Sequence, residues 1–519
     1  MIKRNGIPFL LCLFSGVILS VVLKYELHWD FINYHYFNGF AFATGRLGYD
    51  IAPVSVNSYL NPLLDALTFW LVNALNDYPD LYYAATGVPF GLLLFACFKV
   101  NTLFFKSRAA VCLSMILAAT GFAAWFQIGT STNEIPLALL AVTALYFLLQ
   151  NKRLFWAGAL LGAAAGFKST AGVYCVSSGA AYFLFHRREY KNIALFALAG
   201  LTGFLTVNGF WMYELHKMFQ NPFFPFFNGI FKSPYFDEIN FSYRQAFENR
   251  GFWQAALLPF SFAAHFDKSY AANICFSDPR LAIAFLLTLG YLPFARKRPL
   301  DRQSAFLAVW MLASYAVWLI GFSVARYLVP VEMLLPVFFV KAAVALRPTK
   351  PDVIKESLIY SLYVVVFSAC VMTPLSSQEW GNRRGYAKIF DMPAINLPEN
   401  TLVLTRNAPN SAYLALLAQK KPLRIVNQTD AVSPALRHYD FVRNPLFSKQ
   451  IKALTDDASL FKIIWYSYDL PRGQIDRLAP EGLKCLKWFS DAAAAQETET
   501  GHLICVPESS FTAVFKDWK

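Results

Sequence analysis

One acidic residue near the start of the chain has the surroundings of a catalytic base. Asp30 follows closely on an apolar run that ends near residue 24, in a segment dense in aromatic and amide side chains. A carboxylate at a water–lipid boundary is partly desolvated, which suits it to accept a proton from an attacking hydroxyl group. The alternative is an N-cap for the segment FINYHYF that follows, because Asp is a favoured N-cap residue. Position alone leaves both interpretations open, and Asp30 is the predicted general base.

Glu134 is a second candidate acid. It ends the stretch IGTSTNE and precedes Pro136, a residue type common in the first turn of a helix. There its charge would complement the helix dipole. The functional alternative is a carboxylate that faces Asp30 across a vestibule and binds a metal ion or the acceptor, so Glu134 is a candidate substrate-binding residue.

Two cations are candidates for binding an anion. Lys168 lies in AGALLGAAAGFKSTAG, where small residues let two short helices pack closely and hold one ammonium group below the outer surface. A lipid phosphate, Glu134 or a backbone carbonyl would satisfy it, and a side chain that snorkels to water is the alternative. Arg326 lies between two apolar runs, and its planar guanidinium group can donate two parallel hydrogen bonds to phosphate oxygens. Glu332 is either the partner of Arg326 or a buried proton carrier.

The segment around Asp30 also contains His28, Tyr34 and His35. His28 and Asp30 would point about 200° apart on one helix, and no Asp-x-Asp pair follows, so the pattern gives little support to a metal site. His28 and His35, two turns apart, are interpreted as hydrogen-bonded interfacial residues. Tyr34 and His35 are also candidate substrate-binding residues, and a divalent cation is left open as a cofactor.

The composition requires a membrane environment for these residues. Of 519 residues, 56% are hydrophobic, 17% aromatic and only 15% charged, against about 25% charged in soluble proteins. A soluble monomer is excluded because it would expose too much apolar surface. The 8 cysteines, without a CxxC pair or Cys/His cluster, exclude a disulfide scaffold and structural zinc. The net charge of +13 does not indicate nucleic acid, because the basic residues lie in loops that set topology and no nucleic-acid motif is present.

Nine apolar runs are long enough to cross roughly 30 Å of hydrocarbon. They lie near residues 7–24, 82–98, 109–126, 135–150, 192–212, 281–295, 304–322, 327–345 and 356–373. Two further regions, 59–75 and 154–185, are ambiguous. The distribution of basic residues decides both, because cytoplasmic loops are enriched in Lys and Arg.

Every strongly basic loop falls on one side if 59–75 lies flat in the interface and 154–185 forms two short helices with Lys168 at the tip. A full span at 59–75 would also bury Asp65 at a cost of about 2.5–3.5 kcal/mol, so an amphipathic interfacial helix is preferred. The prediction is an all-α membrane domain of about eleven transmembrane helices. Its N-terminus is inside, and the first span is an uncleaved anchor because no small-residue cleavage site follows it.

The charged fraction rises near Pro374. We therefore expect two domains, a membrane domain over residues 1–373 and an extracytoplasmic α/β domain over 374–519, with a linker at about 373–385. The stretches TLVLTR, SAYLALLAQ and LRIVN predict a βαβ-like unit, and three later stretches predict strands. Cys485 and Cys505 lie in the last two strands, and a disulfide between them is left open.

On this topology, several motifs together resemble the GT-C superfamily of integral-membrane glycosyltransferases, which includes aminoarabinose and protein O-mannosyl transferases. They are WDFINYHYFNGFAFATGRLGYD, the interfacial NPLLD segment, STNEIPLALL, GAAAGFKSTAG, NPFFPFFN and Arg326-Tyr327. Together they cover about residues 7–345, and the C-terminal domain lies outside the match.

The resemblance implies transfer of a hexosyl or pentosyl group from a polyprenyl-phosphate donor, with inversion, at the outer face of a bacterial inner membrane. Asp30 matches the catalytic acid position of the superfamily, Arg326 would bind the donor phosphate, and Lys168 is assigned by analogy. The acceptor would be a lipid, a polysaccharide or a protein. Unlike metal-dependent members, the chain lacks an Asp-x-Asp in its first outer loop, which puts a required cation in doubt.

Two other classes remain as alternatives. A transporter or flippase of lipid-linked sugars would use the same charged residues to line a path, but the paired repeats typical of transporters are absent from the sequence. An O-antigen-type polymerase or ligase would use a pyrophosphate carrier, for which two external Arg clusters would be expected rather than Arg326 alone.

Overall fold

The computed structural model describes residues 2–24, 28, 30–240, 252–264, 277–297, 299–321, 323–345, 353–373, 388–390, 392, 394–406, 411–428, 444–470, 482–489 and 499–516. The chain divides into two compact units. The first comprises Met1–Tyr25, Tyr83–Asn208 and Tyr243–Trp380, and the second comprises Glu26–Tyr82, Gly209–Ser242 and Gly381–Lys519. Apart from Thr373, the expected linker at 373–385 lies outside the described residues.

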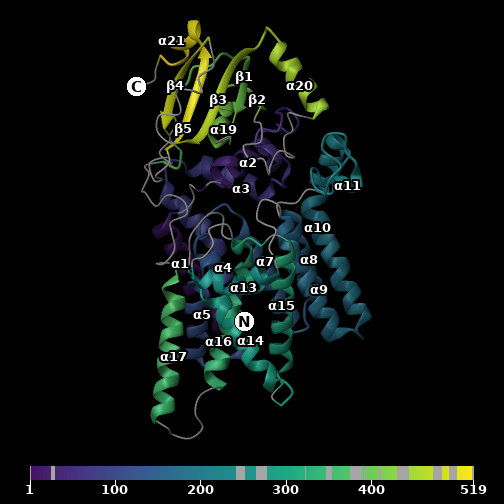
Figure 1. Ribbon diagram of the computed structural model, residues 1–519, viewed down its shortest axis with the longest axis vertical. Coiled ribbons are helices and arrows are strands. Elements are labelled where there is room, and N and C mark those ends of the chain that lie inside the picture. Colours follow the sequence, from purple (N-terminus) through teal and green to yellow (C-terminus); the bar gives the residue numbers. More distant parts are fainter. Residues whose placement is uncertain are drawn as a thin grey trace. The chain divides into compact units, whose positions relative to one another are not determined.

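The first unit is built from helices (Figure 1). They are α1 (Ile2–Leu23), α4 (Pro79–Phe104), α5 (Arg108–Ala119), α6 (Phe122–Trp125), α7 (Glu134–Leu149), α8 (Leu154–Phe167), α9 (Gly172–His186), α10 (Tyr190–Phe219), α13 (Phe252–Ala264), α14 (Arg280–Tyr291), α15 (Arg302–Gly321), α16 (Val329–Ala345) and α17 (Val353–Val371). Short 3₁₀ turns, η3 (Ser169–Ala171) and η6 (Ala325–Leu328), precede α9 and α16. The boundary between the units falls inside α4 and α10.

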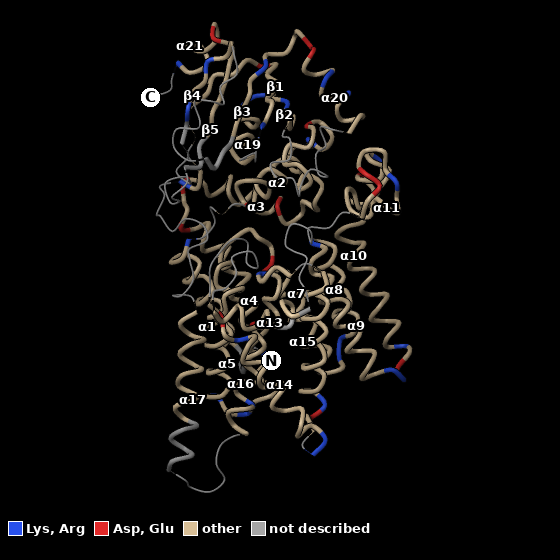
Figure 2. Tube along the Cα trace, in the orientation of Figure 1, with Lys and Arg blue, Asp and Glu red and all other residues tan. Residues whose placement is uncertain are grey.

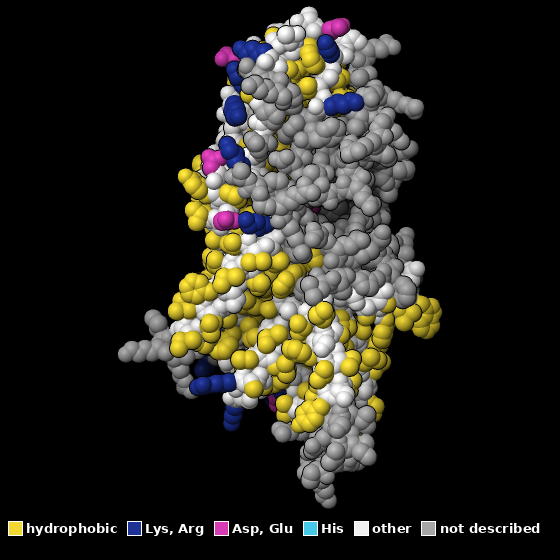
Figure 3. All heavy atoms as spheres, turned by 90° about the vertical axis from the view of Figure 1, so that its left-hand side faces the viewer, with side chains coloured by type: hydrophobic (Ala, Val, Ile, Leu, Met, Phe, Trp, Pro, Cys, Tyr) yellow, Lys and Arg dark blue, Asp and Glu magenta, His cyan; other side chains and the backbone are white. Residues whose placement is uncertain are grey.

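Apolar helices confirm the predicted membrane character of the chain. Within the described residues, five helical segments are long and apolar enough to cross a membrane: Gly6–Leu23, Pro79–Phe104, Tyr190–Phe219, Arg302–Gly321 and Ala325–Ala345. Six shorter apolar segments accompany them: Leu63–Leu75, Arg108–Ala119, Glu134–Leu149, Leu154–Phe167, Arg280–Phe294 and Tyr360–Val371. Hydrophobic side chains gather over the helical part of the face that Figure 3 shows. Exposed large hydrophobic residues on these helices include Leu11, Ile18 and Leu198, as expected for surfaces in contact with lipid. The count of eleven spans remains a prediction.

Basic connections of the first unit meet at one end of its helices. Arg302 Nη2, at the start of α15, donates to the Phe185 carbonyl near the end of α9 at 3.0 Å. Gln303 Nε2 donates to the Leu149 carbonyl at the end of α7 at 3.2 Å. Figure 2 shows charged residues at the turn between α9 and α10 and at the connection before α15, and few along the helices between.

The glycines of α8 pack against α10. A Cβ added at Gly158 would lie 2.2 Å from the Phe196 carbonyl oxygen, and one at Gly162 would lie 1.8 Å from the Gly200 carbonyl oxygen. The close approach of small residues that the sequence predicted is therefore present, but these glycines contact α10, whereas the prediction placed them between the two short helices α8 and α9.

The predicted span at 109–126 is interrupted. Helix α5 ends at Ala119, and α6 begins at Phe122. The Glu332 carboxylate accepts hydrogen bonds from the backbone N–H groups of Ala123 at 2.9 Å and Ala124 at 3.0 Å. A buried carboxylate thus satisfies N–H groups that a continuous helix would have paired internally, and this partner, about two hundred residues away, allows the break.

The second unit combines short helices with a small sheet (Figure 1). Its helical elements are η1 (Phe31–His35), α2 (Tyr36–Ala43), η2 (Ser55–Tyr59), α3 (Leu63–Leu75), α11 (Asn228–Phe231), α19 (Ser411–Lys420), α20 (Pro445–Asp456), η11 (Glu508–Ser510) and α21 (Phe511–Val514). The strands β1 (Thr401–Arg406), β2 (Arg424–Asn427), β3 (Phe461–Leu470), β4 (Leu483–Phe489) and β5 (Glu499–Pro507) have the order β2-β1-β3-β5-β4.

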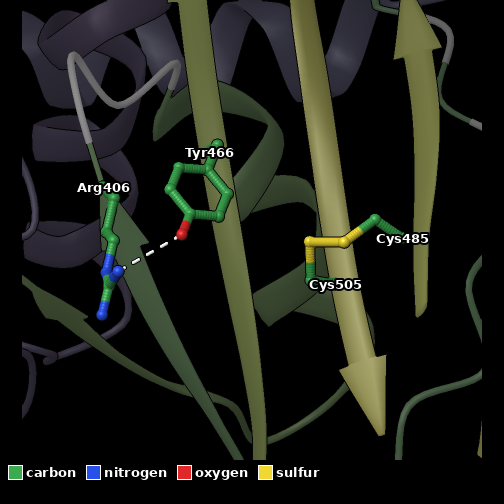
Figure 4. Close-up of a disulfide and its surroundings, with 4 residues drawn as sticks. All are labelled: Arg406, Tyr466, Cys485 and Cys505. Carbon is green, nitrogen blue, oxygen red and sulfur yellow. Dashed lines mark hydrogen bonds between the residues drawn. A yellow bond between two sulfur atoms is a disulfide. The ribbon is translucent and has the colours of Figure 1, made fainter. Parts of the chain in front are cut away.

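The strand pairing confirms the predicted α/β fold of this sheet. Strand β1 pairs in parallel with β2 and β3, so β1, α19 and β2 form the expected βαβ unit. Strand β5 is antiparallel to both β3 and β4. Cys485 and Cys505 are direct cross-strand partners and form a disulfide with an S–S distance of 2.05 Å (Figure 4). In the same sheet, Arg406 Nη1 donates to the Tyr466 hydroxyl at 3.2 Å (Figure 4).

Candidate functional site

Lys168 is held where three distant segments of the first unit meet. It lies at the break between α8 and η3, with an extended backbone. Its Nζ donates to the Glu134 carboxylate and, at 3.0 Å, to the Thr132 carbonyl. The same Nζ lies 5.5 Å from the centre of the Tyr327 ring. The sequence offered Glu134 and a backbone carbonyl as partners for this ammonium group, and the structure shows both.

Glu134 is the first residue of α7 and is buried. Asn133 before it has a φ of +73°, in the left-handed region that Asn tolerates better than most residues. This backbone turn directs the start of α7 and the Glu134 carboxylate toward Lys168. The dipole interpretation of Glu134 therefore describes only part of its surroundings, because the carboxylate also neutralises a cation.

Polar contacts fix Arg326 and Tyr327 beside the segment 127–134. Gln127 Nε2 donates to the Arg326 carbonyl at 3.1 Å, while Gln127 Oε1 accepts from Thr132 Oγ1 at 2.9 Å. The Tyr174 hydroxyl donates to the Tyr327 carbonyl. The Arg326 guanidinium carbon lies 5.4 Å from the centre of the Tyr327 ring, which Lys168 also contacts. Two cations and one carboxylate thus share this cluster, an excess of positive charge that suits a phosphate group.

Glu332 makes contacts that the sequence did not predict. Its carboxylate caps α6, as described above, and Asp278 Oδ2 accepts from the Phe122 N–H at 3.0 Å beside it. Arg280 completes this buried junction, with Nη1 2.9 Å from Asp278 Oδ2 and Nη2 2.9 Å from the carbonyls of Leu117 and Cys370.

Asp278 and Arg280 were not identified from the sequence, although the stretch SDPR at the start of an apolar run marks them. A cavity of about 20 Å³ lies beside Asp278, Arg280 and Glu332, enough for one water molecule. Because Arg280 joins the ends of α5, α14 and α17 through these bonds, we assign the junction a structural role.

The surroundings of Asp30 do not support the N-cap interpretation. Asp30 is buried, with 6% of its surface exposed. In the stretch 30–36, all of which the structure describes, its side chain makes no capping hydrogen bond to η1. His28 Nδ1 instead accepts from the Phe31 N–H at 3.3 Å. The carboxylate of Asp30 is therefore not occupied by the helix that follows it.

His35 forms a buried pair with Asp65 of α3. Its Nδ1 lies 2.6 Å from Asp65 Oδ1, which confirms that His35 is hydrogen-bonded. The carboxylate favours the tautomer with the proton on Nδ1. Nε2 is buried and has no hydrogen-bond partner among the described residues. The buried Tyr34 ring lies 4.2 Å from the His35 ring, so both candidates belong to one packed turn next to Asp30.

The six predicted site residues fall into two groups. Glu134, Lys168 and Arg326 meet in the first unit, and Asp30, Tyr34 and His35 lie together in the second. Within the described part of the chain, no group of three or more His, Cys, Asp or Glu side chains is placed to bind a metal ion.

Comparison with known proteins identifies the fold. No family model and no curated protein matches the sequence. The crystal structure of ArnT from Cupriavidus metallidurans bound to undecaprenyl phosphate matches with 14% identity and a TM-score of 0.51, over 97% of this chain and 98% of that one. ArnT from the same organism in the apo state gives 14% identity and a TM-score of 0.52 over the same shares. At this identity the likeness shows the fold: the chain has the overall fold of ArnT over nearly its whole length.

Proposed function

We propose that this protein is an inverting membrane glycosyltransferase that moves a sugar from a polyprenyl-phosphate donor to an acceptor hydroxyl at the outer face of the bacterial inner membrane. The observation that carries the proposal is the fold shared, over nearly the whole chain, with a protein crystallised with undecaprenyl phosphate. The cluster of Lys168 and Arg326 supports it, because it supplies the positive charge that a lipid phosphate needs.

In this mechanism Asp30 accepts the proton of the acceptor hydroxyl while the hydroxyl oxygen attacks the anomeric carbon. The bond from that carbon to the phosphate oxygen breaks with its electron pair, so negative charge builds on the leaving polyprenyl phosphate. Lys168 and Arg326 stabilise this charge, which lowers the barrier because the cations are already in place. The Lys168 ammonium exchanges part of its contact with Glu134 for the phosphate.

Tyr34 and His35 contribute to substrate binding in the proposal. The buried Nε2 of His35, with Nδ1 held by Asp65, can accept a hydrogen bond from a sugar or acceptor hydroxyl, and the Tyr34 ring offers an apolar face. The acceptor is a lipid, a polysaccharide or a protein.

We also propose that the membrane domain spans residues 1–373 and that residues 374–519 form a periplasmic domain. The Cys485–Cys505 disulfide supports this placement, because such bonds persist in oxidising compartments. The meeting of the basic turns at one end of the first unit supports a cytoplasmic location for that end.

The test is transfer by the purified protein. A polyprenyl-monophosphate sugar is supplied in detergent without a membrane gradient, and release of polyprenyl phosphate is measured. Asp30→Asn is expected to abolish transfer while leaving expression intact, because an amide of the same shape cannot accept the proton. Retention of more than a few per cent of activity would remove Asp30 from the base role, and movement of intact donor across vesicles without cleavage would favour a flippase.

A further inference from the structure

The segment between α1 and α3, which the sequence places at the outer face and which is called the first outer segment below, extends the sheet of the second unit. Ile51 forms a parallel bridge to Val426 of β2, with the Ile51 N–H donating to the Ile425 carbonyl at 3.0 Å and the Asn427 N–H donating to the Ile51 carbonyl at 3.1 Å. Asp50 Oδ1 accepts from the Ile425 N–H at 2.9 Å. Strand pairing therefore connects residues nearly four hundred positions apart.

Arg46 adds a second connection. Its Nη2 donates to the Leu423 carbonyl at 2.6 Å. Nε and Nη2 also bind the Asp50 carboxylate at 2.8 and 2.7 Å, and the guanidinium lies 4.7 Å from the centre of the Tyr49 ring. Such a bidentate, stacked arrangement fixes the side chain, so the sheet and the outer segment are connected through a rigid pair.

The third connection reaches the turn that carries Asp30. The Ser411 hydroxyl, at the first residue of α19, donates to the Asn33 carbonyl inside η1, and Ser411 is fully buried. Element η1 is a single π-helical turn ahead of the α-helix α2. Such turns are rare inside α-helical segments and are frequent at functional sites.

A fourth set of contacts secures the residues just after this turn. Gln419 Nε2 of α19 donates to the Tyr36 hydroxyl at 3.1 Å, and that hydroxyl donates to Asn73 Oδ1 at 3.0 Å. The Phe390 ring stacks on Phe31 with 5.3 Å between ring centres and lies 4.9 Å from the Tyr36 ring. Burial raises the pKa of Tyr36 to about 12, so its hydroxyl stays a neutral donor at physiological pH.

We infer that α19 of the C-terminal domain positions the catalytic aspartate, with Ser411 and Gln419 as positioning residues that hold η1 in its π-helical form. Relaxation of the π turn to an α turn would shift the register by one residue and rotate Asp30 relative to His35 by about 100°. The inference rests on the proposed function, because the orientation of Asp30 matters only if Asp30 acts on a substrate.

The experiment compares Ser411→Ala with Ser411→Thr, which keeps the hydroxyl, and with Lys420→Gln, a control on the exposed end of the same helix. Steady-state kinetics with a polyprenyl-monophosphate sugar give kcat and the donor KM. Hydrogen exchange of the peptide covering residues 30–40, measured by mass spectrometry on the full chain, reports on η1 directly. Thermal unfolding shows whether each variant is folded.

Ser411→Ala is expected to lower kcat about tenfold or more, since small misplacements of a catalytic group cost that much, with an unchanged donor KM and melting temperature. Exchange at residues 31–36 is expected to accelerate, and Ser411→Thr is expected to restore both readouts. Unchanged kcat, unchanged exchange, or a kcat loss that the threonine variant does not rescue overturns the inference.

The proposed function and the inference can be contradicted by different measurements. If the wild-type protein transfers no sugar, the exchange measurement still decides whether α19 holds η1. Faster exchange in Ser411→Ala then supports the positioning contact, and unchanged exchange overturns it.

Discussion

Lys168 has the most constrained charge in the candidate site. Its ammonium group contacts a carboxylate, a carbonyl and an aromatic ring from two other segments of the chain. Only 16% of its side chain is exposed, and only 4% of the Glu134 side chain. A charge held this way is already oriented before any ligand binds, which is what stabilisation of a leaving phosphate requires.

Lys168→Gln is expected to lower kcat/KM for a polyprenyl-monophosphate sugar by about 100-fold, the usual effect of losing one group that stabilises developing charge. Glu134→Gln is expected to lower the donor KM, because the phosphate no longer competes with a carboxylate for the ammonium group. Lys341→Gln is the matched control, because Lys341 pairs with Asp301 at 2.7 Å outside the site. Equal losses in the two lysine variants would contradict a phosphate role for Lys168.

His502 makes the stability of the second unit depend on pH. It is fully buried, and its Nδ1 accepts from Trp465 Nε1 at 3.1 Å. Burial lowers the pKa of His502 from 6.5 to about 3. Between these values the unfolded chain binds more protons than the folded one, so stability rises with pH across this window and is lost as pH falls below 6.5.

At pH 5 this histidine is expected to destabilise the folded state by about 2 kcal/mol relative to pH 8. Thermal unfolding of the detergent-solubilised protein at the two pH values measures the effect. His502→Gln, which keeps an acceptor for Trp465, is expected to reduce the difference between the two melting temperatures. A difference that persists undiminished in that variant would assign the pH dependence to other groups.

At the scale of helices and strands, the sequence predicted best what depends on local patterns. The short apolar stretches TLVLTR and LRIVN identified β1 and β2 because each pattern is complete within a few residues. The interruption between α5 and α6 could not be predicted in this way. It depends on Glu332 and Asp278, which are far away in the sequence. The residues around them do not indicate which N–H groups they bind.

The contact between α8 and α10 depends on glycine. Gly162→Ala is expected to lower the melting temperature strongly, because the added Cβ would lie 1.8 Å from the Gly200 carbonyl oxygen and the helices must separate. Gly179→Ala in α9 is the matched control, since a Cβ added there would have no heavy atom within 4 Å apart from its chain neighbours and its own helix backbone. It is expected to be neutral or stabilising by up to about 1 kcal/mol, from helix propensity alone. Similar melting temperatures for both variants would contradict the close packing.

At the scale of the whole molecule, charge distribution and composition were informative because they sum over many residues. They predicted a helical membrane fold with a small C-terminal sheet, and the likeness to ArnT confirms that fold. The composition gave no indication that the first outer segment joins the C-terminal sheet. That association depends on backbone pairing at Ile51 and on the side chains of Arg46 and Asp50, which leave no trace in averaged properties.

The disulfide provides a test of whether the C-terminal sheet lies in an oxidising compartment. Protein alkylated in intact membranes without reductant is expected to leave Cys485 and Cys505 unmodified, and both are expected to react once a reductant is added. Mass spectrometry of the peptides that contain them measures this. Full modification of both residues before reduction would contradict an oxidising location for the sheet.

The bridge between Ile51 and β2 also has a consequence for solubility. The unpaired N–H and C=O groups of an edge strand can pair with a strand of another molecule. Natural proteins cover or shorten such strands to prevent aggregation. Strand β2 has only four residues, and Ile51 occupies its free side. Removal of the first outer segment would therefore do more than displace the turn that follows Asp30, because it would leave an unpaired strand edge through which separate copies of the sheet could associate.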